Sequence, residues 1–259
     1  MVSIIIPCYN SATTIQRALA SIVNQTYTDF EIIIVDDGST DNSFEKIKTF
    51  FENKDIQHTL IKQQNKGAAS ARNLAVKNSH GEYLAFLDAD DEWHQNKLEI
   101  QYKYIKKLNA KFISCEYTYN TLENTIVTID IIKYTFKDFL FSNRTSTPCT
   151  IIQRDLFNQV NGFQENQRYS EDYYLWLRAS YITNLYKLNV PLVKLYKSAY
   201  GENGLSAQLW KMEKGELHNY VTLYHLNLIS LFVTIKHMTI SFLKFLRRYV
   251  LVTIKRNNK

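Results

Sequence analysis

Short apolar runs alternate with segments of helical periodicity through the first third of the chain. The apolar runs predict strands at residues 2–6, 31–35, 58–61 and 83–87. Between them, apolar positions recur every three or four residues, which predicts helices at 15–23, 44–51 and 68–78. We expect Ser11 to cap the first helix and Ser39 or Thr40 to cap the second. Strands that alternate with amphipathic helices predict a parallel α/β sheet flanked by helices.

The second half of the chain is less regular but contains the same kinds of element. Its patterns predict strands at 112–116, 126–129, 149–152, 185–188 and 192–196, and helices at 136–141, 155–160 and 170–179. No repeat, low-complexity tract or linker rich in proline and glycine divides the chain. We therefore expect residues 1–210 to form one domain, in which the second half completes a site built by the first.

Polar side chains follow three of the predicted strands at their carboxyl ends. Pro7-Cys-Tyr-Asn10 follows the first strand, Asp36 and Asp37 follow the second, and Asp88-Ala-Asp90 follows the strand at 83–87. Ligands of parallel α/β sheets bind outside the carboxyl ends of the strands. We therefore expect these residues to face one crevice.

The composition is that of an ordinary globular protein. With 45% hydrophobic and 22% charged residues, the chain is unlike disordered, collagen-like or disulfide-stapled proteins. Cys8, Cys115 and Cys149 are an odd number without metal-site or disulfide spacing, so we interpret them as reduced core thiols. The N-terminus lacks the pattern of a signal peptide, and we expect a cytoplasmic protein.

The positive charge lies at one end of the chain. The formal net charge is +6, but residues 211–259 carry nine Lys or Arg and two Glu, which leaves residues 1–210 at −1. A basic tail on a near-neutral body argues against a general nucleic-acid-binding surface. We expect residues 211–259 to form a separate amphipathic, basic helical extension.

Four carboxylates lie within five residues directly after an apolar strand: Asp88, Asp90, Asp91 and Glu92. Like charges this close repel, so a cation or bulk water must stabilise them. Carboxylate oxygens at a strand end suit Mg²⁺ or Mn²⁺, which water and substrate phosphates complete. The alternative interpretation is a solvated acidic loop that caps the following helix.

Three further segments carry polar groups of the kinds that bind ligands or act in catalysis. Asp36 and Asp37, in Val-Asp-Asp-Gly-Ser-Thr-Asp, can accept hydrogen bonds from a base or a ribose, although an ordinary β–α turn has the same composition. Residues 65–73 place basic groups beside the crevice, and Arg72 can pair with a carboxylate or a phosphate; an exposed basic helix start fits equally well. The acids at 171–172 also suit a helix start.

The glycine-rich phosphate loops G-x-G-x-x-G and G-x-x-x-x-G-K-[ST] do not occur in the chain. This excludes the pyrophosphate loops of dinucleotide-binding proteins and P-loop enzymes. A bound nucleotide would then depend on a metal for most of its phosphate contacts.

Six motifs follow one another along the chain in the order P-x-Y-N, V-D-D-G-S-T-D, N-x-G-x-x-x-A-R-N, F-L-D-A-D-D, G-F and E-D-x-x-L-W-x-R. This ordered set resembles the family 2 glycosyltransferases. These are inverting enzymes of the GT-A fold, and the resemblance covers about residues 1–206. It implies a nucleotide-diphospho-sugar transferase fold with a mostly parallel central sheet flanked by helices.

The resemblance also implies roles for individual residues. The nucleotide would be held by Pro7, Tyr9, Asp36, Asp37, Lys66, Arg72, Asn73 and Asp88. Asp90 would ligate Mn²⁺ or Mg²⁺ on the diphosphate, and Asp172 would be the catalytic base. The acceptor side or the support of the catalytic helix would involve Gly162, Glu171, Trp176 and Arg178.

The chain departs from the family pattern at two places. Asn161-Gly-Phe-Gln-Glu165 stands where the family often has G-G-F-D-E, so the sugar or acceptor contacts here differ. Residues 196–206 contain no histidine near Ser206, where the family often has a further metal ligand.

The basic tail has the pattern of an interfacial helix. It has no acidic residue after Glu216, and on a helical projection Lys236, Lys244 and Arg247 lie largely opposite Phe242 and Phe245. Such a helix binds anionic lipid, while a helix that packs on the body with a solvated basic face is the alternative. Polar residues at 217–235 argue against a membrane span.

We therefore expect a metal-dependent transferase that moves a sugar from a nucleotide donor to a saccharide or lipid-linked acceptor. The expected donor is a UDP-hexose or UDP-N-acetylhexosamine, and the setting is surface polysaccharide or lipooligosaccharide synthesis at the inner face of the cytoplasmic membrane. The tail would contact that membrane, and no nucleic acid is expected as a partner. The alternative is a catalytically silent, nucleotide-binding, membrane-associated scaffold protein.

Overall fold

A computed structural model describes residues 1–123, 128–197 and 207–257 of the chain. The strands are β1 (Val2–Cys8), β2 (Phe30–Asp36), β3 (His58–Lys62), β4 (Tyr83–Phe86), β5 (Glu92–Trp93), β6 (Phe112–Thr118), β7 (Ile131–Tyr134), β8 (Ile151–Gln153) and β9 (Leu185–Lys194). The helices are α1 (Ile15–Val23), α2 (Ser43–Phe51), α3 (Ala68–Lys77), α4 (Lys97–Leu108), α5 (Phe136–Phe141), α6 (Arg154–Gln159), α7 (Glu171–Ile182), α8 (Leu209–His225) and α9 (Leu231–Asn257), with a 3₁₀ turn, η1, at Thr147–Cys149.

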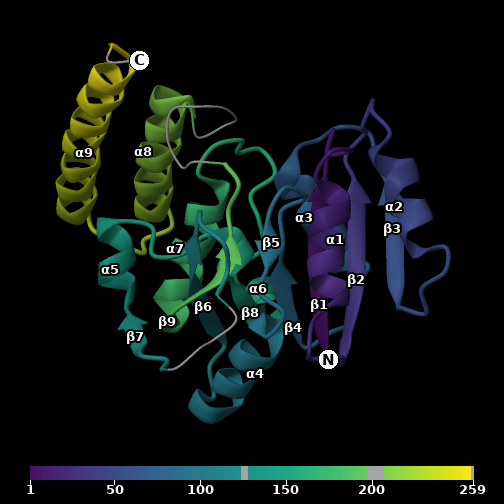
Figure 1. The fold of residues 1–259 in the computed structure, drawn as a ribbon. Coiled ribbons are helices and arrows are strands. Elements are labelled where there is room, and N and C mark those ends of the chain that lie inside the picture. The colour runs from purple at the N-terminus through teal and green to yellow at the C-terminus, as the bar shows by residue number, and fades with distance from the viewer. Residues whose placement is uncertain (124–127, 198–206, 258–259) are drawn as a thin grey trace.

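The strands form one mixed sheet in the order β3-β2-β1-β4-β8-β6-β9-β5, and β7 pairs with β9 (Figure 1). The pairing directions leave β1, β2, β3, β4, β6 and β9 pointing the same way. This confirms the predicted α/β fold with a mostly parallel sheet. The strands β1 and β2 carry unbroken apolar runs at residues 4–6 and 32–35, because helices cover both faces of the sheet.

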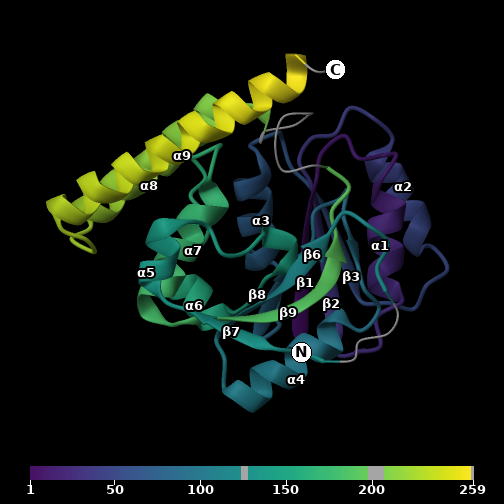
Figure 2. The same ribbon diagram turned by 60° about the vertical axis from the view of Figure 1, so that its left-hand side comes forward.

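Alternate residues of the strands build two cores. Ile4 and Ile6 face α1, α2 and α4 in one core, while Ile5 and Ile33 face α3, α6 and α7 in the other. Figure 2 shows the sheet between these helices, with α8 and α9 beyond α5 and α7. The period-two alternation of a strand therefore supplies both layers.

Two predicted helix caps are wrong. The helix α1 begins at Ile15 and α2 at Ser43, and neither has a side-chain cap hydrogen bond. Ser11 donates its backbone N–H to the Ser43 hydroxyl, and Ser39 accepts the Asn10 N–H. The hydroxyls of Ser39 and Ser43 thus connect the loop after β1 to the segment after β2. These serine residues make contacts between segments instead of capping their own helices.

The second half differs from the predicted strands in three places. The strands predicted at 185–188 and 192–196 are one strand, β9, which continues through Pro191 with register shifts opposite β6. Residues 149–152 enter β8 only after η1. Of the strand predicted at 126–129, residues 126 and 127 lie outside the described residues, and the strand in this region is β7.

The C-terminal extension is a pair of helices. The helices α8 and α9 run antiparallel (Figure 1). Trp210 of α8 packs on Phe245 of α9. The pair contacts the body through α8 on α7 and α9 on α5. No helix among the described residues combines the length and apolar character needed to cross a membrane.

Candidate active site

The predicted polar strand ends lie side by side. The strand β1 is hydrogen-bonded between β2 and β4, with Cys8 opposite Asp36, and Asp37 donates its backbone N–H to the Cys8 carbonyl at 2.7 Å. The acidic turn at Asp88 follows β4 directly. The sheet order therefore brings together three segments that are separated by up to 80 residues in the sequence.

Asp36 and Asp37 have different surroundings. Asp37 is buried, and its carboxylate accepts hydrogen bonds from the Gln63 side chain and the backbone N–H groups of Lys66 and Gly67, at 2.7–2.8 Å. Asp36 is also buried, but neither of its carboxylate oxygens has a donor in the structure. Burial and the Asp36 charge raise the pKa of the Cys8 thiol to about 11. Asp37 thus orders the 63–67 loop, and Asp36 is free to accept from a ligand.

The rim of this part of the site consists of Pro7, Tyr9 and the adjoining loop. The Tyr9 side chain is 50% exposed, whereas Pro7 is half-buried in β1. Asn10 has a positive φ of 48° and accepts the Thr40 N–H with its side chain. The loops after β1 and β2 are held together, with the Tyr9 ring presented to the solvent.

Lys66 and Asn73 lie on either side of Arg72, but their side chains have different surroundings. The Lys66 side chain is exposed, while its backbone N–H donates to Asp37. The Asn73 amide spans the backbone of Phe163, to which it donates at 2.8 Å and from which it accepts at 3.0 Å. A Cβ at Gly162, whose φ is +57°, would lie 2.9 Å from the Asn73 carbonyl oxygen. Asn73 and Gly162 together fix the loop before α7.

Arg72 links the two acidic segments. Its guanidinium is buried, contacts Asp88 at 2.6 Å and Glu171 at 3.4 Å, and lies 5.2 Å from the centre of the Phe163 ring. Burial alone would lower the pKa of Arg72, but the Asp88 and Glu171 charges raise it. One cation therefore holds the end of β4 against the start of α7.

The acidic turn carries more negative charge than Arg72 neutralises. Asp90 pairs with Lys197 at 2.6 Å, and its backbone carbonyl accepts from Arg17. Burial and the charges of Asp88 and Asp90 raise the pKa of Asp91 to about 8. Like charges that oppose each other's ionisation in this way favour a cation at the turn.

The chemistry of the turn fits a divalent cation. No group of three or more His, Cys, Asp or Glu within the described ranges has the geometry of a metal site. Mg²⁺ is commonly bound through one or two carboxylates and completed by water and substrate phosphates. The Asp88 and Asp90 carboxylates supply oxygen ligands of this kind.

The start of α7 carries the predicted base. Asp172 is partly buried and accepts a hydrogen bond from the Asn143 side chain at 3.4 Å. Burial raises its pKa, and burial together with the Asp172 charge raises the pKa of Glu171 to about 7. A carboxylate with a raised pKa beside a crevice has the property required of a general base near neutral pH.

Trp176 and Arg178 lie behind this acidic pair. Trp176 is fully buried against Phe112 and Phe163. Arg178 donates to the backbone carbonyls of Val160 and Gly162, the second at 2.7 Å. These two side chains support α7 and the Gly162 loop from the core side.

The sequence analysis missed the part that α8 plays. Asn219 is fully buried, donates to the Ser170 carbonyl at 3.1 Å and accepts from Gln167 at 2.7 Å. A Cβ at Gly215 would overlap the Tyr169 carbonyl oxygen. The backbone of Ser170, with a φ of 58°, is therefore held by α8 directly before Glu171. Arg17 and Lys197 were also missed; only the helical spacing and the position after a predicted strand could have suggested them.

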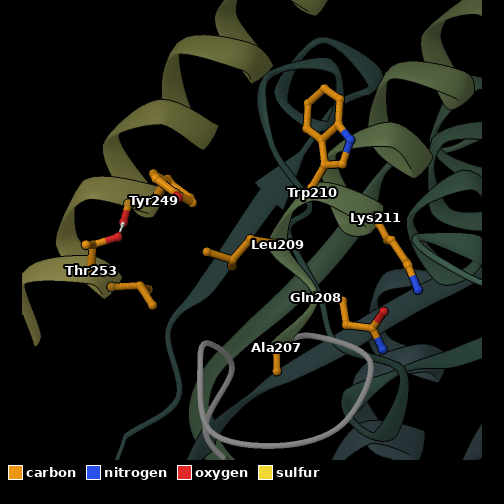
Figure 3. A pocket seen from close by; sticks show the side chains of 8 residues that line it. Ala207, Gln208, Leu209, Trp210, Lys211, Tyr249 and Thr253 are labelled. Atoms are coloured by element: carbon orange, nitrogen blue, oxygen red, sulfur yellow. Dashed lines mark hydrogen bonds between the residues drawn. The ribbon is translucent and has the colours of Figure 1, made fainter. Parts of the chain in front are cut away.

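A cavity lies at one end of the pair formed by α8 and α9, beside the residues that precede α7 (Figure 3). It has a volume of about 350 Å³, and its lining includes Trp210 and Lys211 from α8 and Tyr249 from α9. The Gln208 side chain, also in the lining, accepts from the Tyr169 hydroxyl at 3.1 Å. The lining of this apolar and cationic hollow is thus in contact with Tyr169, which lies three residues before Asp172 in the sequence.

Comparison with known sequences gives one family. The sequence model described as "Glycosyl transferase family 2" matches residues 3–160. An uncharacterized glycosyltransferase of Rickettsia bellii is 37% identical over 69% of the chain, which spans 26% of that relative. A UDP-Glc:alpha-D-GlcNAc-diphosphoundecaprenol beta-1,3-glucosyltransferase of Escherichia coli, WfgD, is 35% identical over 73% of the chain and 73% of the relative. The chain spans only about a quarter of the length of the first of these relatives.

Solved structures with the same fold are more distant in sequence. S. aureus TarS 1–349 in complex with UDP-GlcNAc aligns with a TM-score of 0.73 at 20% identity, over 96% of this chain and 72% of the 1–349 chain. A mannosyltransferase of Pyrobaculum calidifontis, in complex with GDP-Man and Mn²⁺, aligns with a TM-score of 0.67 at 19% identity, over 86% of this chain and 64% of the other. At this identity the likeness concerns the fold.

Proposed function

The chain belongs to glycosyl transferase family 2, and from that premise we propose that it transfers a sugar from a nucleotide donor to a saccharide or lipid-linked acceptor with inversion. The observation that carries the proposal is the acidic site itself. Asp36, Asp90 and Asp172 come from three segments, and each has a different task in such a transfer.

The donor is a UDP-sugar, either a UDP-hexose or a UDP-N-acetylhexosamine. Both oxygens of Asp36 lack a donor, and a buried carboxylate in this state gains strongly from an N–H or hydroxyl of a base or ribose. Tyr9 presents its ring at the rim, where it can cover the base. The UDP-Glc named for WfgD and the UDP-GlcNAc bound to TarS support this choice.

Asp172 is the catalytic base. Its carboxylate takes the proton of the acceptor hydroxyl while that oxygen attacks the anomeric carbon from the face opposite the diphosphate. The bond between the anomeric carbon and the diphosphate oxygen breaks, and the nucleoside diphosphate leaves with the electron pair, so that the configuration inverts. Asn143 and the α8 contacts to Ser170 orient the base for this step.

The leaving diphosphate requires positive charge. Mn²⁺ or Mg²⁺ bound by Asp90, with Asp88 beside it, would neutralise the charge that develops on the diphosphate. The Mn²⁺ in the Pyrobaculum complex supports a divalent ion. Arg72 keeps Asp88 in place, and the exposed side chain of Lys66, whose backbone N–H donates to Asp37, would contact a phosphate.

The acceptor approaches from the side of α8. WfgD acts on a diphosphoundecaprenol-linked sugar, which supports a lipid-linked acceptor and a role in surface polysaccharide or lipooligosaccharide synthesis. Trp210 and Lys211 line a cavity beside Tyr169 and suit an apolar chain with an anionic head. The protein would act at the inner face of the cytoplasmic membrane, with its tail at the lipid surface.

The first test uses two single variants, Asp172→Asn and Asp90→Ala. Asp172→Asn is expected to lower transfer by roughly 10²–10⁴-fold while UDP binding changes little, because only the base is lost. Asp90→Ala is expected to remove the Mn²⁺ dependence of UDP binding measured by calorimetry. Full transfer by Asp172→Asn would refute its role, and a wild-type chain that binds UDP without any donor turnover would favour a catalytically silent scaffold.

A further inference from the structure

The outward face of α9 is an exposed apolar surface. Its solvent-facing positions recur every three, four or eight residues, which follows the helical period. They carry large apolar side chains that are between about two fifths and four fifths exposed: Phe232, Ile235, Leu243, Leu246, Val250 and Ile254. We call these six residues the outward stripe. Large exposed apolar patches on a soluble surface mark sites of interaction with a partner or a membrane.

The inner face of α9 is already used. Phe245 is buried against Trp210, and Arg248 pairs with the buried Glu213 at 3.1 Å. Lys244 donates to the Phe141 carbonyl and lies 3.5 Å from the centre of the Phe141 ring. Lys244, which the helical projection assigned to lipid, and Arg248 are therefore engaged within the protein.

The charges that border the outward stripe are positive. Lys236 and Arg247 are exposed beside it, and the sequence has no acidic residue from Leu217 to the C-terminus. An apolar stripe with basic neighbours complements an anionic bilayer surface, into which the apolar side chains insert while the cations meet the headgroups. A second copy of the chain would bring equally positive charges together.

We propose that the outward stripe of α9 is the surface by which this protein docks on an anionic lipid bilayer. The proposal rests on the proposed function in one respect, because a lipid-linked acceptor gives the docking its purpose. In both views α9 is the outermost element on its side, and its C-terminal end lies at the same end of the molecule as the carboxyl ends of the parallel strands (Figures 1 and 2). Docking there holds the active-site edge near the membrane.

The test is flotation of the full chain with vesicles of phosphatidylcholine and phosphatidylglycerol, and with vesicles of phosphatidylcholine alone. The wild type is expected to float with the anionic vesicles. Leu243→Ser with Leu246→Ser is expected to lower the partition coefficient at least about tenfold, because two inserted side chains are lost. The matched control is Tyr181→Ser with Ile182→Ser, which removes exposed apolar side chains from the end of α7 and is expected to float like the wild type.

Three results would overturn the docking surface. They are a wild type that does not float, stripe variants that float normally, and a wild-type dimer in light scattering that the stripe variants convert to monomers without any vesicle binding. UDP binding measured without lipid keeps the two proposals distinct. Flotation without UDP binding contradicts the proposed function alone, and UDP binding without flotation contradicts the docking surface alone.

Discussion

Neighbouring acidic residues at this site have opposite roles, which the sequence does not distinguish. Asp37 is saturated by three donors from the 63–67 loop, whereas the Asp36 oxygens have none. Glu171 is paired with Arg72, whereas Asp172 accepts a hydrogen bond from the neutral Asn143 side chain at 3.4 Å. In our proposal, one carboxylate of each pair orders the site and the other takes part in the transfer.

The raised pKa values predict an acid limb in the rate profile. The base must be unprotonated, and burial raises the pKa of Asp172 while the pKa of Glu171 is raised to about 7. We expect kcat/KM to fall on the acid side at a higher pH than an ordinary aspartate would give. The Asn143 side chain donates to Asp172 and lowers its pKa, so Asn143→Ala should move this limb to still higher pH. A profile of Asn143→Ala that coincides with the wild type would contradict this coupling.

At the scale of elements, α8 holds the start of α7 in place. It packs against the residues before α7 through the small Gly215 and the buried Asn219, so the start of α7 is fixed from outside the region that the family model matches. The predicted boundary at 210–211 separates a near-neutral body from a basic tail. The packing of α8 on α7 shows why the basic extension cannot be considered apart from the site.

Gly215→Ala is expected to lower transfer more than UDP binding. The added Cβ overlaps the Tyr169 carbonyl, which shifts Ser170 and the base that follows. Overpacking of this kind costs about 1–3 kcal/mol of unfolding free energy. Kinetics, calorimetry and urea unfolding measure the three effects. Lys214→Ala, at the exposed neighbouring position, is the control and should change none of them substantially.

At the scale of the whole molecule, the helix pair is held by a buried ion pair as well as by apolar contacts. Glu213 is fully buried, and Arg248 reaches it and also Glu216, at 3.1 and 3.6 Å. The single buried carboxylate on α8 thus selects which face of α9 turns inward. The orientation of the outward stripe follows from this choice.

Arg248→Met is expected to lower the unfolding free energy by roughly 2 kcal/mol, since it leaves the buried Glu213 charge without its partner. The partial exposure of Arg248 keeps the cost below that of a fully buried pair. Arg247→Met removes the same charge from the adjacent exposed position and should cost less than about 0.5 kcal/mol. Equal urea midpoints for the two variants would rule out a structural role for the Glu213 pair.

The sequence by itself determined the class of fold and the segments that form the site. The Ile-rich strands and the polar residues at their ends are local patterns, and the order of motifs identified the family that the family model then matched. It also determined the amphipathic, basic character of the tail. These features can be predicted from the sequence because each depends on neighbouring residues within one strand, one turn or one helical period.

Only the tertiary structure decided that Asp36 lacks a donor whereas Asp37 has three. The same is true of the single strand at 185–194 and of Ser11 and Ser39, which join two loops instead of capping helices. It also decided which face of α9 is covered and that Asn219 holds the start of α7. Each of these depends on contacts between residues tens of positions apart in the sequence. No local pattern specifies such contacts, because they form only when the two cores and the helix pair pack together.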